Sequence, residues 1–351
     1  MITINNINDI SKIKVSSEIR QLTINNIDDL TFLNETFNNL RLLIINNSLT
    51  SFVPNIQTIN LLKLNNCNNI ETLPNTLINI TKIEIHNCKK LKLIPKEFTK
   101  INLIKIFNCE NLENLPKEFI NLENLELDSC PKINKISDTY TKLTALIISE
   151  CHNIQYIPET YSNITNFVEI NDCDNIKTVP KSWTKLKYLF VGGCKNFEYV
   201  PDTLTSLNKL EFKNCPKIEK IPDTFTNIET LLLTNCPKIN KIPDNFININ
   251  YILLDSCLNI KNIPNTFINL DYLEIIDNPN IENIPDKFIN LDKLLITKCP
   301  KINKIPESLK SLHYLIIEKC NNIEISDTIK QYLMVLKIDE NVLIPDVVIY
   351  F

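Results

Sequence analysis

The pattern of apolar and polar residues along the chain repeats about every 21 residues. The stretch LEFKNCPKIEKIPDTFTNIET (residues 210–230) is followed directly by LLLTNCPKINKIPDNFININY (231–251). Both fit the template LxLxxCxxIxxIPxxFxxIxx, which recurs from Ile2 to Ile338. A regular repeat overrides the domain count that a length of 351 residues would otherwise suggest. We therefore predict a single domain, residues 1–351, built of stacked repeats of 20–22 residues.

Each repeat contains two apolar residues separated by one residue, as in Leu125-Glu126-Leu127. This alternation predicts a short strand with one face toward a core and the other toward solvent. Seventeen such pairs follow one another, beginning with Ile2/Ile4, Leu22/Ile24 and Leu42/Ile44 and ending with Leu336/Ile338. Because equivalent residues of stacked repeats lie over each other, the pattern predicts a parallel sheet of about 17 strands on the concave face of a repeat solenoid.

The return limb of each repeat is marked by proline. Most repeats carry Ile-Pro, and an aromatic residue or leucine follows three residues after the proline, as in Pro222 and Phe225. Proline favours an extended limb, and the remaining residues are too few for an α-helix, so we expect an extended or 3-10 convex side. One extra residue lies between Ile164 and Val168, and we expect it to bulge there and leave the sheet in register.

Twelve cysteines, from Cys67 to Cys320, occupy one position of the template, and we place Asn47 and Asn278 at that position in two other repeats. We interpret the cysteines as a buried ladder of thiols, each packing as a small apolar group that donates weakly to the backbone. Disulfides between neighbouring repeats are an alternative at the expected spacing, although equivalent side chains point the same way. Zinc is a further alternative, but its usual CxxC ligand pairs do not occur.

The form LxxLxLxxCxxIxxIP resembles the cysteine-bearing leucine-rich repeats of plant disease-resistance receptors and similar proteins of giant amoebal viruses. The resemblance covers essentially the whole chain. It implies a leucine-rich repeat horseshoe with little α-helix, a role as a protein-binding scaffold, and a viral protein as one possible source. The chain departs from the plant receptors because two glycines are too few for a Gly-rich phosphate-binding loop, and we expect no cofactor.

Composition and charge narrow the function classes. A net charge of −4 argues against a generic nucleic-acid or anionic-membrane binder, whose footprint would be basic. No apolar run is long enough to span a membrane, and the first residues do not read as a signal peptide. We therefore expect an intracellular, cytoplasmic protein, in the host cytoplasm if it is viral. The three histidines, His86, His152 and His313, are widely separated, so we expect no catalytic cluster and no enzyme.

The outward positions of the predicted strands carry the candidate binding residues. In the second half of the chain they are rich in aromatic and aliphatic side chains, which mark partner sites more often than chance. The candidate partner-binding residues are Phe167, Tyr188, Phe190, Leu232, Tyr251, Leu253, Tyr272, Ile276, Leu295, Tyr314 and Ile316. Gly192 and Gly193 lie among them and would allow a ligand to approach the backbone. We predict a non-catalytic scaffold that engages a protein partner of unknown identity through this face.

A structural or self-assembling protein is the alternative. Solenoids need capped ends to remain soluble. Residues 339–351 form the predicted C-terminal closing segment, and its last residues, VVIYF, could add a strand or pair with another chain. End-to-end self-association through the terminal strands would follow from the second possibility.

Overall fold

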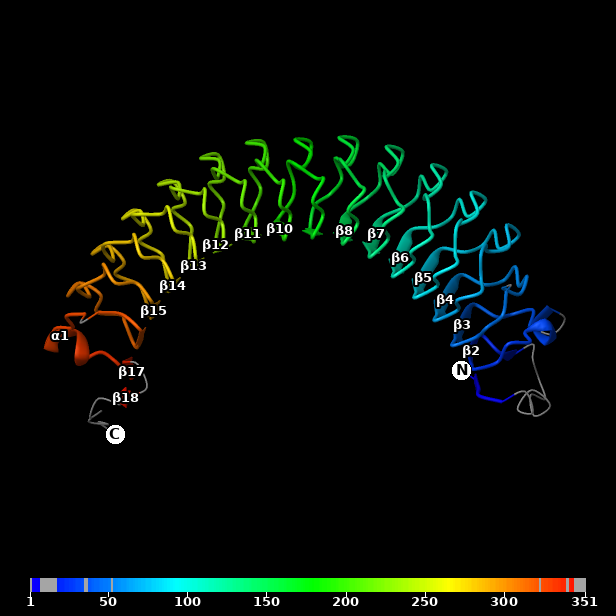
Figure 1. Ribbon diagram of the computed structural model, residues 1–351, viewed down its shortest axis with the longest axis horizontal. Coiled ribbons are helices and arrows are strands. Elements are labelled where there is room, and N and C mark those ends of the chain that lie inside the picture. The colour runs from blue at the N-terminus through cyan, green and yellow to red at the C-terminus, as the bar shows by residue number, and fades with distance from the viewer. Residues whose placement is uncertain are drawn as a thin grey trace. The chain divides into compact units, whose positions relative to one another are not determined.

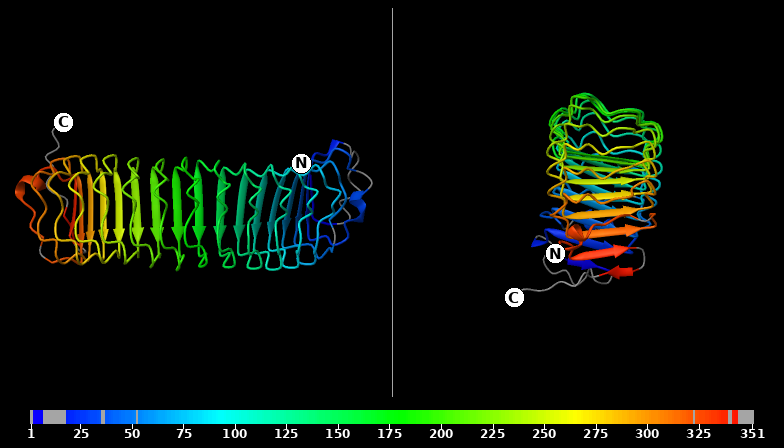
Figure 2. Two further views of the ribbon diagram at one scale, coloured as in Figure 1. Left: turned by 90° about the horizontal axis from the view of Figure 1, so that it is seen from above. Right: turned by 90° about the vertical axis from the view of Figure 1, so that its left-hand side faces the viewer.

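A strand of four or five residues in nearly every repeat forms the sheets of this protein. The computed structural model describes residues 2–6, 18–34, 37–51, 53–321, 323–338 and 341–343. The chain divides into two units, Met1–Ile176 and Lys177–Phe351, here called unit 1 and unit 2. In each unit the strands lie side by side along one side and the turns lie along the other (Figure 1, Figure 2). The side that carries the outward-pointing residues of the strands is called the sheet face.

Unit 1 contains parallel strands that pair in chain order. They are β1 (Ile2–Ile4), β2 (Gln21–Asn25), β3 (Leu42–Asn46), β4 (Leu61–Asn65), β5 (Lys82–His86), β6 (Leu103–Phe107), β7 (Asn124–Asp128), β8 (Ala145–Ser149) and β9 (Phe167–Asn171). Each strand pairs in parallel with the next. A short 3-10 helix, η3 (Thr31–Asn34), lies between β2 and β3.

Unit 2 has the same organisation and ends on an antiparallel strand. Its strands are β10 (Tyr188–Gly192), β11 (Lys209–Lys213), β12 (Thr230–Thr234), β13 (Tyr251–Asp255), β14 (Tyr272–Ile276), β15 (Lys293–Thr297), β16 (Tyr314–Glu318), β17 (Val335–Ile338) and β18 (Asn341–Leu343). Strands β10 to β17 pair in parallel, and β18 turns back to pair antiparallel with β17. A single helical turn, α1 (Asp327–Lys330), precedes β17. The predicted strand VVIYF lies outside the described residues.

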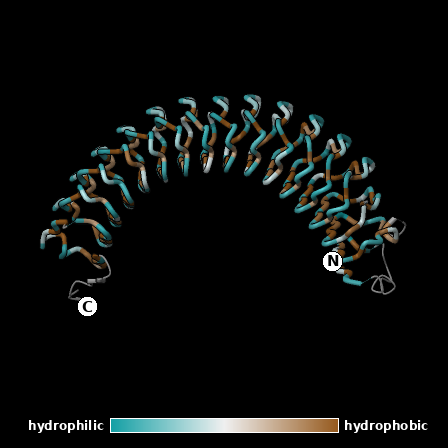
Figure 3. The backbone as a smooth tube through the Cα atoms, in the orientation of Figure 1, coloured by the Kyte–Doolittle hydropathy of each residue, from teal (hydrophilic) through white to brown (hydrophobic). Residues whose placement is uncertain are grey.

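The alternation of side chains explains why these segments are strands. In β13, Ile252 and Leu254 are fully buried while Tyr251 and Leu253 point to the opposite face. Hydrophobic and hydrophilic stretches alternate within the coils of each unit (Figure 3). The predicted repeat solenoid with parallel strands and little helix is therefore confirmed. The extra residue before Val168 leaves β9 in register with β8, as predicted, because Val168 pairs with Leu146.

The prediction for the third strand was wrong by one residue. We predicted Leu42 and Ile44 as its inward pair, whereas the structure buries Leu43 and Ile45. The register pairs Leu22 with Leu43, and Leu43 with Leu62. The segment LLIIN has four apolar residues in a row, so its alternation does not specify a face, and a shift of one residue exchanges the two faces.

The cysteine ladder is present, with one corrected member. All twelve cysteines are free thiols, eleven of them buried and Cys320 half-buried. A typical thiol, that of Cys257, lies 3.6 Å from the carbonyl oxygen of Leu233 in the preceding repeat and 3.5 Å from that of Asp255. Asn278 occupies a ladder position as predicted, but Asn47 does not. The buried residue there is Ser48, whose hydroxyl donates to the carbonyl of Ile27 at 2.7 Å.

The residue before each ladder position has a left-handed backbone, which the sequence analysis missed. The φ angles of these non-glycine residues, from Asn26 to Lys319, lie between 48° and 57°, and φ of Gly193 is 62°. In this conformation the amide N–H of Asn66 donates to the carbonyl of His86 in the next repeat at 2.9 Å. Asparagine is common here because it tolerates the left-handed region better than most residues. Gly193 therefore has a local conformational reason to be glycine.

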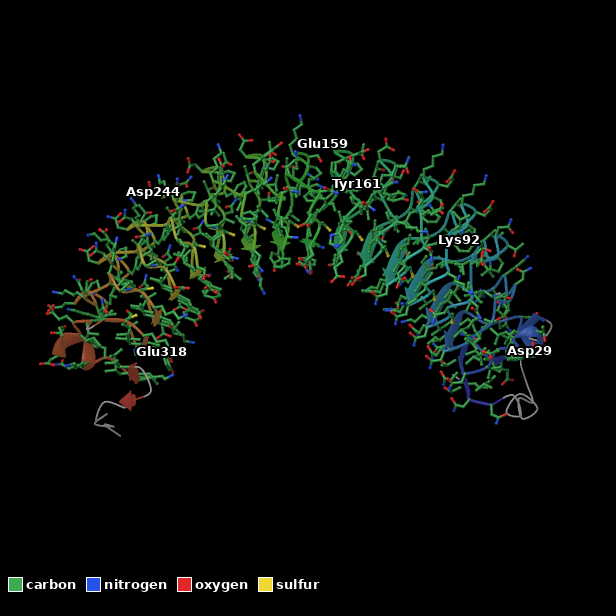
Figure 4. All side chains as sticks on the ribbon, viewed as in Figure 1. Asp29, Lys92, Glu159, Tyr161, Asp244 and Glu318 are labelled. Carbon is green, nitrogen blue, oxygen red and sulfur yellow. The ribbon has the colours of Figure 1, made fainter. Side chains whose placement is uncertain are left out.

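Aromatic residues fill the layer between the sheet and the turns. The ring that follows the proline by three residues is fully buried in many repeats, for example at Phe119, Tyr161 and Phe225, and Tyr140 occupies the same position after Ser137. The hydroxyl of Tyr161 donates to the carbonyl of Ser137 in the preceding repeat at 2.6 Å. Figure 4 shows Tyr161 within this layer, with Glu159 at the outer rim. Each of these repeats thus contributes a large ring to a core shared with its neighbours, as nearest-neighbour stacking requires.

Candidate functional site

The outward positions of β10–β16 form the surface here called the unit 2 face. Ten of the eleven predicted binding residues lie on it: Tyr188, Phe190, Leu232, Tyr251, Leu253, Tyr272, Ile276, Leu295, Tyr314 and Ile316. All ten point away from the core. Nine are half-buried by their neighbours, and Tyr314 is 39% exposed. Phe167 also points outward, from β9, but it belongs to unit 1. The structure therefore groups ten of the candidates on one unit and places Phe167 on the other.

Strand register aligns these side chains in columns. Tyr251 lies opposite Tyr272, and Leu232 lies opposite Leu253. The rings of Tyr251 and Tyr272 stack, with centroids 4.7 Å apart and planes inclined by 7°. Stacked aromatic pairs contribute about 0.5–1.5 kcal/mol beyond their buried area. The two rings therefore support each other and present a flat, pre-ordered surface.

Glutamate side chains at the middle outward position of the strands accept hydrogen bonds from two of the tyrosine hydroxyls. Tyr188 donates to a carboxylate oxygen of Glu211 at 2.8 Å, and Tyr251 donates to Glu274 at 3.3 Å. Partial burial, with the nearby charge of Glu274 adding to it, raises the pKa of Tyr251 to about 12. The tyrosine therefore remains a neutral donor at physiological pH. The ammonium of Lys209 lies 4.3 Å from the ring centroid of Tyr188 and 3.4 Å from the carboxylate of Glu211. These three side chains therefore contact one another on strands β10 and β11.

The sheet face of unit 1 mixes charged and amide side chains with outward apolar residues, among them Leu42, Ile44, Phe107 and Ile147. Charge alternates between neighbouring strands, with Lys63 2.5 Å from Glu84 and Lys105 2.7 Å from Glu126. Asparagine side chains form a further ladder in which each amide donates to the amide oxygen of the preceding repeat at 2.6 Å; its members are Asn5, Asn25, Asn46 and Asn65. Sequence reasoning missed this ladder, although asparagine recurs at that template position. These polar groups are partners of one another, and the apolar residues of the face lie among them.

A hollow on the unit 2 face surrounds Lys293, a residue that the sequence analysis did not select. Its volume is about 260 Å³, and its walls are Tyr272, Lys293, Leu295, Tyr314 and Ile316, together with Leu294. The ammonium nitrogen of Lys293 lies 5.3 Å from the ring centroid of Tyr314. A single lysine at an outward strand position is usually an ordinary solvated side chain. The sequence alone did not indicate that Tyr272 and Tyr314 would lie on either side of Lys293.

Comparison with known proteins identifies the fold. No protein-family model matches the sequence, and neither does any curated protein. Among solved structures, a leucine-rich repeat protein from Bacteroides eggerthii superposes with a TM-score of 0.55 at 15% identity, over 87% of this chain and 66% of that one. The functional domain of InlJ from Listeria monocytogenes, described as including a cysteine ladder, gives a TM-score of 0.53 at 15% identity, over 92% and 68%. This chain has the leucine-rich repeat fold.

TLR13, in its complex with a single-stranded RNA, has a higher TM-score, 0.60, at 15% identity. The match covers 90% of this chain but only 54% of the TLR13 chain. At these identities the likeness concerns the fold alone. The cysteine ladder of these leucine-rich repeats nevertheless has a described counterpart in InlJ.

The histidines of the leucine-rich repeats take part in local contacts. His86 stacks on Phe107 of the neighbouring strand, with centroids 4.4 Å apart. His313 contacts Asp292 of the preceding repeat, with 2.6 Å between Nδ1 and Oδ1, a pair that sequence reasoning missed. In the described part of the chain, no group of three or more His, Cys, Asp or Glu residues is placed to hold a metal ion. None of the described helices is long and apolar enough to cross a membrane.

Proposed function

We propose that this chain is a non-catalytic scaffold that binds a partner protein through the unit 2 face. The observation that carries the proposal is the aromatic and aliphatic surface on the outward positions of β10–β16, where a solvent-facing sheet would normally carry polar residues. Stacked tyrosines suit this role because they supply large contact area at low cost in conformational entropy. Repeat solenoids commonly bind partners through such extended faces.

The charge of the face favours a protein partner over a nucleic acid. The chain carries a net charge of −4, and Glu211 and Glu274 lie in the middle column of the face. These carboxylates would repel phosphates, whereas nucleic-acid binders generally concentrate basic residues. The RNA complex of TLR13 therefore does not transfer to this chain as a partner class. The twelve free thiols support a reducing, intracellular location, because such compartments keep cysteines unpaired.

End-to-end self-association is the second class that the sequence left open. It would involve the ends of the array, and residues 344–351 lie outside the described residues. An experiment can distinguish partner binding from self-association. Replacing tyrosines of the unit 2 face should weaken partner binding, but it should not change how the oligomeric state depends on protein concentration.

The proposal predicts that Tyr251→Ala combined with Tyr272→Ala weakens binding strongly. The full chain would first select ligands from a displayed library of random dodecapeptides. Removal of the stacked pair should lower the affinity of the selected peptides about thirtyfold or more, since central aromatic residues commonly contribute 2 kcal/mol or more. Titration calorimetry or fluorescence anisotropy measures the change.

Two exposed tyrosines on the turn side give a matched control. Tyr156 is 61% exposed and Tyr199 is 49% exposed, and neither lies on a strand. Changing both to alanine removes the same number of rings and should leave the affinity within about twofold of wild type. A greater loss in the control pair than in the sheet-face pair would place binding on the turn side and refute the proposal.

A further inference from the structure

Lys293 differs from two other outward-pointing lysines of unit 2, each of which has a carboxylate partner. Lys209 forms an ion pair with Glu211, and Lys337 of β17 forms one with Glu318. Among the described residues, no carboxylate forms an ion pair with Lys293. The acidic residue closest in the columns, Glu274, accepts the hydroxyl of Tyr251 instead. The ammonium of Lys293 is therefore a cation on the face without an anion of its own.

The surroundings of Lys293 are apolar and aromatic. Strand register places it between Tyr272 and Tyr314 in the first outward column, with Leu295 and Ile316 side by side in the second. These residues line an open hollow of about 260 Å³, a volume large enough for one aliphatic or aromatic side chain and an adjoining carboxylate. The side chain of Lys293 is exposed, so a carboxylate of a bound segment can reach the ammonium beside the ring of Tyr314.

We propose that this hollow, here called the Lys293 cradle, receives an aspartate or glutamate side chain of the partner protein together with a neighbouring aliphatic or aromatic residue. Lys293 supplies the charge complement, and Leu295, Ile316 and the two tyrosine rings cover the apolar side chain. The columns continue on both sides, to Tyr251 and to Val335, so the partner segment runs across the cradle rather than ending in it. The proposal rests on the proposed function and specifies the chemistry that the unit 2 face recognises.

Lys213 provides a matched control for charge. It is exposed on the same face, in β11, and its register neighbours are Gly192 and Thr234 instead of tyrosines. Lys293→Glu and Lys213→Glu therefore make the same change in net charge, and only the first changes the cradle. Both positions are exposed, so both variants should fold, which circular dichroism checks directly.

The test uses the full chain and the peptides selected from the dodecapeptide library. We expect the selected peptides to carry Asp or Glu next to Leu, Ile, Met or Phe. Their affinity should fall about tenfold or more with Lys293→Glu and by less than about twofold with Lys213→Glu. Replacing the peptide's acidic residue by its amide should weaken binding to wild type and have little further effect on the Lys293→Glu variant. Amidation of the peptide's C-terminus should leave the affinity unchanged.

Three results would overturn the inference. Equal losses with the two lysine variants would show a general charge effect, no loss with Lys293→Glu would show that the cradle is not used, and loss on amidation would assign the carboxylate to a chain terminus. In each case the proposed function still holds if Tyr251→Ala with Tyr272→Ala weakens the same peptides. If neither the lysine nor the tyrosine changes matter, both proposals are wrong.

Discussion

Between pH 9 and pH 11, each unit should lose about 2 kcal/mol of unfolding free energy per pH unit because of two of its ladder thiols. Burial raises the pKa of Cys109 and Cys173 in unit 1 to about 12, and that of Cys257 and Cys299 in unit 2 to about 11. Each thiol that ionises in the unfolded chain but not in the folded chain contributes about 1.4 kcal/mol per pH unit. The effect exceeds that of most single substitutions.

The direction follows from linkage. An unfolded thiol has a pKa of about 8.5, so below that pH both states are protonated and the stabilisation is fully present. As the pH rises above it, the unfolded state releases protons that the folded state retains, and stability falls until the folded pKa is reached. Urea unfolding at pH 8, 9, 10 and 11 under a reducing agent measures the slope.

A variant in which these four cysteines become serine is the control. Serine already occupies the ladder at Ser48, where it is buried and hydrogen-bonded, so the fold tolerates the hydroxyl. Serine does not ionise in this range, and the variant should therefore lose this part of the alkaline slope. Parallel stability curves for the variant and wild type would show that these thiols are not held neutral by burial.

Asn278→Ala should destabilise unit 2 by about 2–6 kcal/mol. The side-chain amide of Asn278 is fully buried and donates to the carbonyls of Leu254 and Ile276 at 2.7 Å each. Its oxygen accepts the backbone N–H of Cys257 at 2.9 Å. Alanine leaves the N–H of Cys257 without the partner it has here, which costs about 1–3 kcal/mol. It also removes one hydrogen bond from each of the two carbonyls, at about 0.5–1.5 kcal/mol each, although that of Ile276 still accepts from the N–H of Ser256 at 2.9 Å. Urea unfolding gives the total, and hydrogen exchange at the amide of Cys257 reports the local loss.

Asn278→Cys is the informative comparison. It restores the residue found at most ladder positions, where a thiol donates to the same two kinds of carbonyl, as Cys299 does to Ile275 and Thr297. This variant should lie within about 1.5 kcal/mol of wild type, since weak thiol donors replace an amide. If alanine and cysteine were equally destabilising, the ladder position would not depend on its donor, contrary to the packing described here.

The sequence predicted the fold well because each repeat restates the same pattern. Wherever Leu or Ile alternates with a polar residue, as in Leu125-Glu126-Leu127, the strand and its inward face were correct. The exception is β3, which has four successive apolar residues, so its alternation does not indicate which side chains face the core. In the structure, its register is seen from the left-handed backbone of Asn47 and from the pairing of Leu43 with Leu22. The left-handed position itself could have been found, since asparagine often precedes the ladder residue.

The candidate site was only partly predictable. Alternation correctly placed Tyr251, Tyr272 and Tyr314 on the sheet face, because it depends on local periodicity. The Lys293 cradle could not be predicted, because its unpaired ammonium depends on which nearby carboxylates already have partners. Glu274, for instance, accepts a hydrogen bond from Tyr251, and such contacts depend on side-chain geometry across strands. Lys293 therefore could not be distinguished from a solvated lysine in the sequence.

The proposed function requires that a ligand cover the unit 2 face, and a fluorescent label tests this directly. In a Cys320→Ser background, where the remaining native thiols are buried, bimane would be attached at Leu253→Cys on the sheet face or at Tyr199→Cys on the turn side. The label should be attached selectively at either site. Titration with a peptide selected by the wild-type chain should change the bimane emission at position 253 and leave it unchanged at 199. A response at 199 without one at 253 would contradict the account.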